Sequence, residues 1–267
     1  MSETSISLGP TPQLVPQDIV PTDIVPLPSC GRVYPAGSPL AGKTGLDIRS
    51  MTARDEDILT SRALVRSGRV IGSLLRSCIL DHDVDPDKML VGDRNSVLIG
   101  IRISGYGPDY PIKVSCPGCD GVIKQDIDLR TLNIKQFPDD ANVEQGKNEF
   151  TFPLPISKKI AVFKLLTGEE ERELLQTIER GRKSNTQEEL VTGRLKMQIV
   201  EISGERDPQR LAGIIRNLPA RDSRGLRKRI DYITPGIELK TTVVCDSCSF
   251  EGEVEVPLGT DFFWPET

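Results

Sequence analysis

Two hydrophobic periods alternate along this chain, and together they predict an α+β fold. Between residues 52 and 108 apolar residues recur every three to four positions, which is the spacing of amphipathic helices. Around residues 110–129 and 238–256 apolar and polar residues alternate, which is typical of half-buried strands. The stretch 169–232 returns to the helical period with two polar breaks, so it should hold three or four helices.

The helical unit after the first short strand, residues 46–108, should contain three helices. Thr52 followed by Asp55 is typical of a capping box, and the helix that they start should end at Gly68. A third helix should begin with Asp93 as its N-cap. Between them, a second helix carries a single apolar stripe, which predicts that the thiol of Cys78 lies in the core. The stripe consists of Val70, Ile71, Leu74, Leu75, Cys78 and Ile79.

A Cys-x-x-Cys turn interrupts each of the two alternating regions, so each region is predicted to be a β-hairpin with a cysteine knuckle at its tip. The two hairpins should form one small antiparallel, zinc-ribbon-like β core. The predicted layout is an extended proline-rich arm over residues 1–45, a strand and helical unit over 46–108, the two halves of the zinc-ribbon-like β domain over 109–149 and 234–267, and an inserted strand and helical subdomain over 150–233.

Two thiolates separated by two residues can bind one tetrahedral ion at ~2.3 Å, and two such knuckles supply a complete set of four ligands. A closed set is typical of a structural zinc ion, here held by Cys116, Cys119, Cys245 and Cys248. A compact ribbon places roughly 15 to 20 residues between its knuckles. The inserted subdomain accounts for the much longer separation here.

Two alternatives to zinc stay open. One knuckle could be a redox dithiol, although neither begins a helix after a strand, and the knuckles could form two disulfides, which a cytosolic chain disfavours. Cys30 has no partner within a motif, and we assign it no role.

The first forty residues contain eight of the twenty prolines and the near-repeat Val-Pro-Gln-Asp-Ile-Val-Pro-Thr-Asp-Ile-Val-Pro. Such a segment favours extended polyproline-like geometry. It is either a solvated tail or a strap that lies on a neighbouring subunit. In the second case its contact residues would be Ile19, Val20, Ile24 and Val25.

Composition narrows the function. The hydrophobic share of 37% fits a globular protein, no apolar run reaches the ~18 residues of a membrane helix, and the first residues lack a secretory pattern, so we expect a cytosolic protein with no membrane partner. His82 is the single histidine, and the common phosphate-loop, dinucleotide, metalloprotease and serine-hydrolase motifs are absent from the sequence. We therefore expect no enzymatic activity.

A basic cluster offers the main alternative function. A net charge of −5 disfavours general nucleic-acid binding. One short stretch nevertheless gathers Arg221, Arg224, Arg227, Lys228 and Arg229. These residues are either a solvated face or protein interface, which the intervening aspartates favour, or the phosphate contacts of a zinc-ribbon regulator.

Large aromatic residues gather near the end of the chain at Phe262, Phe263 and Trp264. The sequence fits two roles for them equally well. They could complete the hydrophobic core, or they could form an interface with a partner.

Several segments together resemble a family of baseplate hub and hub-assembly proteins from contractile-tailed, T-even-like bacteriophages. The segments are residues 27–35, 51–60, 92–94, 102–107 and 261–265, together with the two knuckles. The resemblance implies a non-enzymatic protein that helps to form, or stays within, the baseplate hub and binds other baseplate and tail proteins. It implies assembly in the host cytoplasm and a place in the virion tail, and it supplies no catalytic residues.

Overall fold

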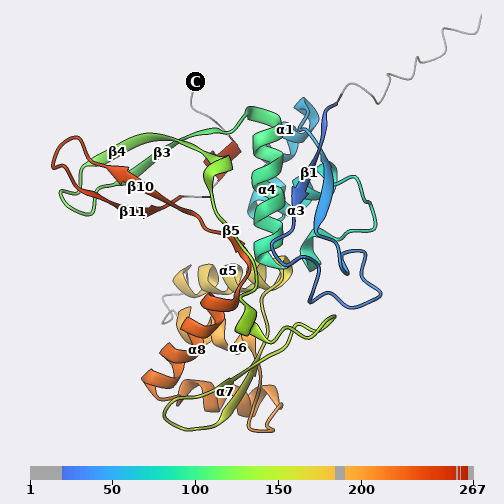
Figure 1. Cartoon of the computed structure of the whole chain (residues 1–267), viewed down its shortest axis with the longest axis vertical. Helices are drawn as coiled ribbons and strands as arrows, with labels where there is room; N and C mark the ends of the chain where they lie inside the picture. The colour runs from blue at the N-terminus through green and yellow to red at the C-terminus, as the bar shows by residue number, and fades with distance from the viewer. Residues whose placement is uncertain (1–19, 184–189, 257, 259, 264–267) are drawn as a thin grey trace, which may run out of the picture.

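The computed structural model describes residues 20–183, 190–256, 258 and 260–263. These residues form helices and five small antiparallel sheets, so the expected α+β class with small antiparallel sheets is confirmed (Figure 1). The helices are α1 (Ala53–Thr60), α2 (Arg62–Arg66), α3 (Val70–Cys78), α4 (Val91–Tyr106), α5 (Gly168–Lys183), α6 (Leu190–Gln198), α7 (Pro208–Arg216) and α8 (Ala220–Ile233), with short 3-10 turns η2 (Pro86–Lys88), η3 (Leu129–Thr131), η4 (Asp139–Ala141) and η5 (Thr260–Phe263). The strands are β1 (Thr22–Pro26), β2 (Gly45–Arg49), β3 (Asp109–Ser115), β4 (Val122–Asp128), β5 (Ile134–Lys135), β6 (Phe150–Pro153), β7 (Ile160–Phe163), β8 (Ile199–Ile202), β9 (Gly236–Ile237), β10 (Lys240–Val244) and β11 (Glu251–Glu255).

Helix α4 lies at the centre of the molecule, with β1 and α3 on one side and the hairpins β3–β4 and β10–β11 projecting on the other (Figure 1). Two glycines let neighbouring segments approach this helix closely. A Cβ on Gly100 would lie 2.2 Å from Cγ2 of Val25, and a Cβ on Gly92 would lie 1.9 Å from the carbonyl oxygen of Pro235. Both contacts therefore require glycine, because any larger residue would push β1 or the chain before β9 away from the helix.

The N-terminal segment from residue 20 onward belongs to this core, which corrects the expectation of an arm over residues 1–45. Strand β1 pairs with β2 in antiparallel register, and Leu27 and Leu40 in the following loop are almost fully buried. The prolines did not prevent this because Pro21 and Pro26 lie at the strand ends and take part through their carbonyl oxygens, which accept from Ser50 N and Ser96 Oγ. Residues 1–19 lie outside the described residues.

A buried carboxylate fixes the loop after β1 on α4. Asp93 accepts hydrogen bonds from Ser29 N (2.9 Å), Ser29 Oγ (2.6 Å) and the hydroxyl of Tyr34 (2.7 Å), and that hydroxyl accepts from Leu90 N (2.8 Å). Burial raises the pKa of Asp93 and outweighs the hydrogen bonds that lower it. Asp93 is therefore not the N-cap that we expected, because Leu90 holds that position and the aspartate turns inward from the first helical turn.

The first predicted helix is broken in two. The capping box of Thr52 and Asp55 is present at the start of α1, which confirms the predicted helix start. At Ser61 the backbone turns to an extended conformation, with φ −64° and ψ 107°, and α2 begins one residue later. Helix α3 confirms the predicted second helix, and Cys78 in it is fully buried, which raises the pKa of its thiol to about 12.

The segment between the two hairpins holds the strands β6, β7 and β8 in one sheet, together with helices α5 to α8. Four helices agree with the expected three or four. The helical period over residues 169–232 predicted a helix at Ile199 and Val200, whereas they begin β8, which pairs with β7. These β-branched residues fit a strand well, and pairing with β7 decides between the two conformations.

Candidate metal centre

The first knuckle is a tight turn between β3 and β4. The amide of Cys116 donates to the carbonyl oxygen of Gly121 at 2.7 Å, and the amide of Asp120 donates to the carbonyl oxygen of Cys116 at 2.9 Å. Asp120 adopts a left-handed conformation with φ 57°. This geometry turns the backbone so that Cys116 and Cys119 point to the same side of the hairpin tip.

The second knuckle repeats this geometry between β10 and β11. Cys245 N donates to the carbonyl oxygen of Phe250 at 2.8 Å, and Ser249 N donates to that of Cys245 at 2.9 Å. Ser249 has φ 55°, which matches the left-handed residue at the same position of the first knuckle. Two segments far apart in the sequence therefore fold into the same local turn.

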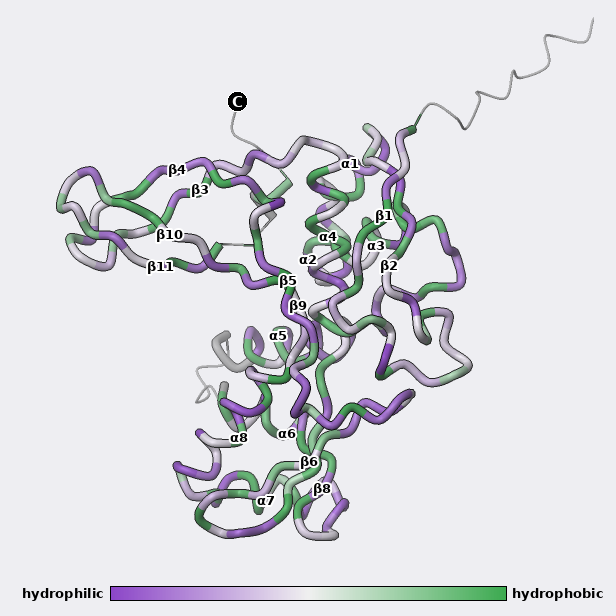
Figure 2. The backbone as a smooth tube through the Cα atoms, viewed as in Figure 1, coloured by the Kyte–Doolittle hydropathy of each residue, from purple (hydrophilic) through white to green (hydrophobic). Residues whose placement is uncertain are grey.

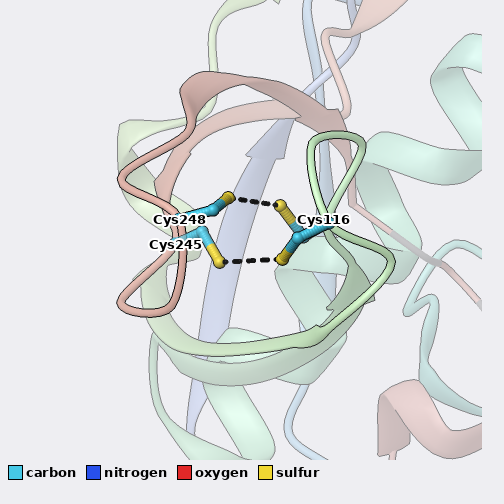
Figure 3. Close-up of side chains that lie close together, drawn as sticks. Cys116, Cys245 and Cys248 are labelled. Atoms are coloured by element: carbon cyan, nitrogen blue, oxygen red, sulfur yellow. Dashed lines mark hydrogen bonds between the residues drawn. The ribbon is translucent and has the colours of Figure 1, made fainter.

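The two knuckles face one another and bring four sulfurs together (Figure 3). The Sγ atoms of Cys116 and Cys248 are 3.6 Å apart, those of Cys119 and Cys245 are 3.8 Å apart, and all four lie within 4.8 Å of one another. Four ligands at ~2.3 Å from a tetrahedral ion would be about 3.8 Å apart, whereas a disulfide needs about 2.05 Å. The cluster has the spacing of a metal site.

The environment favours the thiolate at Cys245, whereas at Cys119 and Cys248 the neighbouring cysteine sulfurs outweigh the backbone amide donors and raise the pKa of the thiol. Backbone amides of Cys248 and Ser247 donate to Cys245 and lower the pKa of its thiol to about 7. Gly118 N points at the sulfur of Cys116 at 3.3 Å. Amide donors at a knuckle stabilise negative sulfur, which is the form that binds metal.

The position of the cluster is partly open. Cys116 and Cys245 are buried, whereas Cys119 and Cys248 are exposed. Gly118 lies against the opposite knuckle, where a Cβ would stand 3.3 Å from the sulfur of Cys248. The cysteine spacing alone does not identify this glycine, although a small residue inside a knuckle indicates that another knuckle approaches closely.

The hairpins have few other links between them. They form two separate two-stranded sheets, β3–β4 and β10–β11, and the alternation of hydrophobic and hydrophilic residues along them is visible in Figure 2. Ile112, Ile123 and Val243 are buried in the apolar core. Besides the sulfur contacts, Gln125 Nε2 donates a hydrogen bond across the hairpins to the carbonyl oxygen of Thr242 at 3.1 Å.

The comparison with known families identifies the chain. The model of the family described as T4 bacteriophage base plate protein matches residues 38–264. The chain belongs to this family. No curated protein and no solved structure matches it. The predicted resemblance to T-even-like baseplate proteins is thus confirmed at the level of the family, and this base plate protein is a structural protein of the phage tail.

The N-terminal residues that we expected to contact a partner differ in exposure. Ile24 on β1 is 69% exposed, and Val20 is half-buried. Val25 is buried against α4, so the expectation that it faces a partner is corrected: the alternation of a strand turns it away from Ile24 and into the core. Ile19 lies outside the described residues.

The C-terminal aromatic residues complete the core of this base plate protein. Phe262 and Phe263 are fully buried, and the ring of Phe262 packs edge-on against Tyr110 with centroids 5.0 Å apart. Of the two alternatives, the burial of both rings favours the core. Trp264 lies outside the described residues.

Arg102 anchors the segment around Phe262, a role that we did not predict from the sequence. Its side chain is buried in the middle of α4 and donates to the carbonyl oxygens of Phe262 (2.9 Å), Gly107 (2.8 Å) and Asp109 (3.2 Å). An arginine between two isoleucines of an apolar helix is the signal that could have identified it, since a charged residue there must find polar partners.

The basic cluster lies on α8. Arg221, Arg224, Arg227 and Lys228 are exposed, whereas Arg229 pairs with Asp140 at 2.6 Å. In the part of the chain that the structure describes, no helix is both long and apolar enough to cross a membrane.

Proposed function

We propose that this base plate protein is a non-enzymatic component of the baseplate hub region, either retained in the tail or acting in its assembly, and that Cys116, Cys119, Cys245 and Cys248 hold a structural zinc ion. The observation that carries the metal assignment is the convergence of four sulfurs at tetrahedral spacing. Four thiolates suit zinc and leave no coordination position for a substrate.

The metal would serve assembly by fixing the hairpins as one rigid projection. The hairpins protrude from the body, so they are suited to contact neighbouring tail proteins (Figure 1). Ile24 on β1, together with Val20 and Ile19, would supply a second contact with a neighbour, since an exposed aliphatic side chain on an edge strand favours covering by another chain.

Metal analysis tests the site. Purified wild-type protein should carry one zinc per chain by mass spectrometry of the metal, and Cys116→Ser should lose it. Cys30→Ser is the matched control, because Cys30 lies outside the cluster, and it should retain the full metal content. A wild-type chain that binds no metal after zinc reconstitution would contradict the assignment.

Quantitative mass spectrometry of purified tails and of assembly intermediates tests the role. A fixed ratio to tube subunits in finished tails would identify a hub component, and presence in intermediates alone would identify an assembly factor. Absence from both would overturn the hub proposal.

A further inference from the structure

Positive charge is concentrated on one face of α8. Arg221, Arg224, Arg227 and Lys228 are all exposed. At 100° per residue they fall within an arc of about 120° and extend along about 10 Å of the helix. None of them takes part in an ion pair resolved among the described residues, so their charge is available to a partner.

Negative charge is concentrated on one face of the β10–β11 hairpin. Glu251, Glu253 and Glu255 alternate along β11 and are exposed. Because alternate residues of a strand share one face, the three carboxylates form a row with steps of about 7 Å. The nearest cation, Lys240, stands opposite the inner end of the row, 3.9 Å from Glu253.

The row is accessible from outside the molecule. Glu253 and Glu255 line an open cleft of about 700 Å³ between the hairpin and the helical region, which also exposes Lys135, Arg194 and Asp231. Glu251, at the outer end of the row, lies outside this cleft. A partner that carries several cations can therefore reach the carboxylates from the outer end of the hairpin.

We propose that the basic face of α8 docks on the acidic row of β11 in a second copy of this chain. The two surfaces have opposite charge and similar length, about 10 Å on the helix and about 14 Å on the strand. They lie on different parts of one molecule, the projecting hairpins and the helical region (Figure 1). A contact between unlike surfaces is head to tail, and it generates a ring when the rotation closes.

A second copy suits the basic face better than a nucleic acid does. A net charge of −5 repels both a nucleic acid and a second copy at long range, but the second copy carries far fewer negative charges than a polyanion. The aromatic residue of α8, Tyr232, has the guanidinium of Arg229 5.5 Å above its ring. The inference requires a folded hairpin, but it does not depend on a location in the hub.

Charge reversal tests the contact in the full-length, zinc-loaded chain. The first variant combines Glu251→Lys, Glu253→Lys and Glu255→Lys, and the second combines Arg221→Glu, Arg224→Glu and Lys228→Glu. A control variant reverses three exposed acidic residues elsewhere, Asp57→Lys, Asp83→Lys and Glu173→Lys. Sedimentation velocity over a range of protein concentrations and salt measures self-association, with circular dichroism to establish folding.

We expect the wild type and the control to self-associate at low salt and to dissociate as salt rises, because exposed charges are screened. Each reversed variant alone should associate at least about ten-fold more weakly, since like charges would then face one another. An equimolar mixture of the two should associate again, because the reversed, basic β11 of the first variant would face the reversed, acidic α8 of the second.

Four results would overturn the proposal. A wild-type chain that is monomeric at low salt, or a mixture that stays monomeric, would exclude the head-to-tail contact. Loss of DNA binding in the second variant, with a monomeric wild type, would instead assign the face to nucleic acid. A sedimentation coefficient that falls on charge reversal but does not change with protein concentration would place the contact within one chain.

Discussion

The region around α4 and the paired hairpins differ in what keeps them folded. Around α4, apolar side chains from β1, α3 and the C-terminal aromatics pack into a continuous core, and buried polar groups such as Asp93 and Arg102 have hydrogen-bond partners. In the described residues the hairpins share no backbone ladder, and the four cysteines and the hydrogen bond from Gln125 to Thr242 link them. The metal that we propose at the four cysteines would compensate for the small apolar area of the projection, so that a core held by burial and a projection held by a ligand would coexist in one chain.

Removal of the metal should give the largest effect and should separate the two regions. Chelation of the wild type should abolish hydrogen-exchange protection in β3, β4, β10 and β11 and leave α4 protected, because structural zinc contributes roughly 10 kcal/mol or more to small sites. Hydrogen exchange measured by mass spectrometry checks this. In Cys116→Ser, which should already lack the metal, the chelator should cause no further loss of protection. Equal loss of protection in α4 would show that the two regions are one cooperative unit.

Arg102→Met should lower the free energy of unfolding of the region around α4 by about 3–5 kcal/mol, since it removes a charged donor from three carbonyl oxygens, of which that of Phe262 is buried. Urea denaturation followed by circular dichroism measures the free energy of unfolding. Arg54→Met, on the exposed face of α1, is the matched control and should change stability by less than about 0.5 kcal/mol. Similar midpoints for the two variants would exclude the anchoring role of Arg102.

The carboxylate of Asp55 should make the helical core sensitive to acid. Burial tends to raise its pKa, but hydrogen bonds from Arg49, Ser77 and Thr52 outweigh burial and hold the pKa well below its usual range. A depressed folded pKa stabilises the protein above the unfolded value of about 3.9, and this contribution is lost as pH falls further. Asp55→Asn should therefore cost about 2 kcal/mol at pH 7 and less at pH 3.

Urea midpoints of the wild type and Asp55→Asn between pH 7 and pH 3 check this convergence. Asp57→Asn is the control on the same helix, because Asp57 is exposed. A difference between wild type and Asp55→Asn that stays constant with pH would rule out the ionised carboxylate as the source.

Gln125→Ala should give the smallest effect. It removes the hydrogen bond from Gln125 to the carbonyl oxygen of Thr242 on the other hairpin, and an exposed bond of this kind contributes about 0.5–1 kcal/mol. Hydrogen exchange of the hairpins in zinc-loaded protein should stay close to wild type. Collapse of hairpin protection would show that side-chain contacts, and not the metal, hold the hairpins together.

Local patterns predicted most of the elements near the candidate site. The spacing of each Cys-x-x-Cys turn within alternating strands predicted both hairpins, because knuckle geometry depends on a few adjacent residues. The capping residues of α1 and the stripe of α3 were equally local. The break at Ser61 and the strand β8 were missed, since both depend on what packs beside them.

The sequence was least informative about burial in the segment around β1 and at the C-terminal aromatic residues. The proline content around β1 indicated an arm, yet the loop after it is pinned by Asp93 and covered by α4. Phe262 fitted core and interface equally in the sequence, and only its contact with Tyr110 decides between them. In both cases the partner lies far away along the chain.

By itself the sequence determined the α+β class, the two cysteine knuckles and the family of baseplate proteins, because short-range spacing specifies turns, helices and ligand pairs. Tertiary structure alone decided that four sulfurs separated by a long insertion meet at one point, that residues 20–45 join the core, and that the aromatic residues turn inward. The physical reason is that packing and coordination depend on distances between remote segments, and chain spacing does not specify those distances.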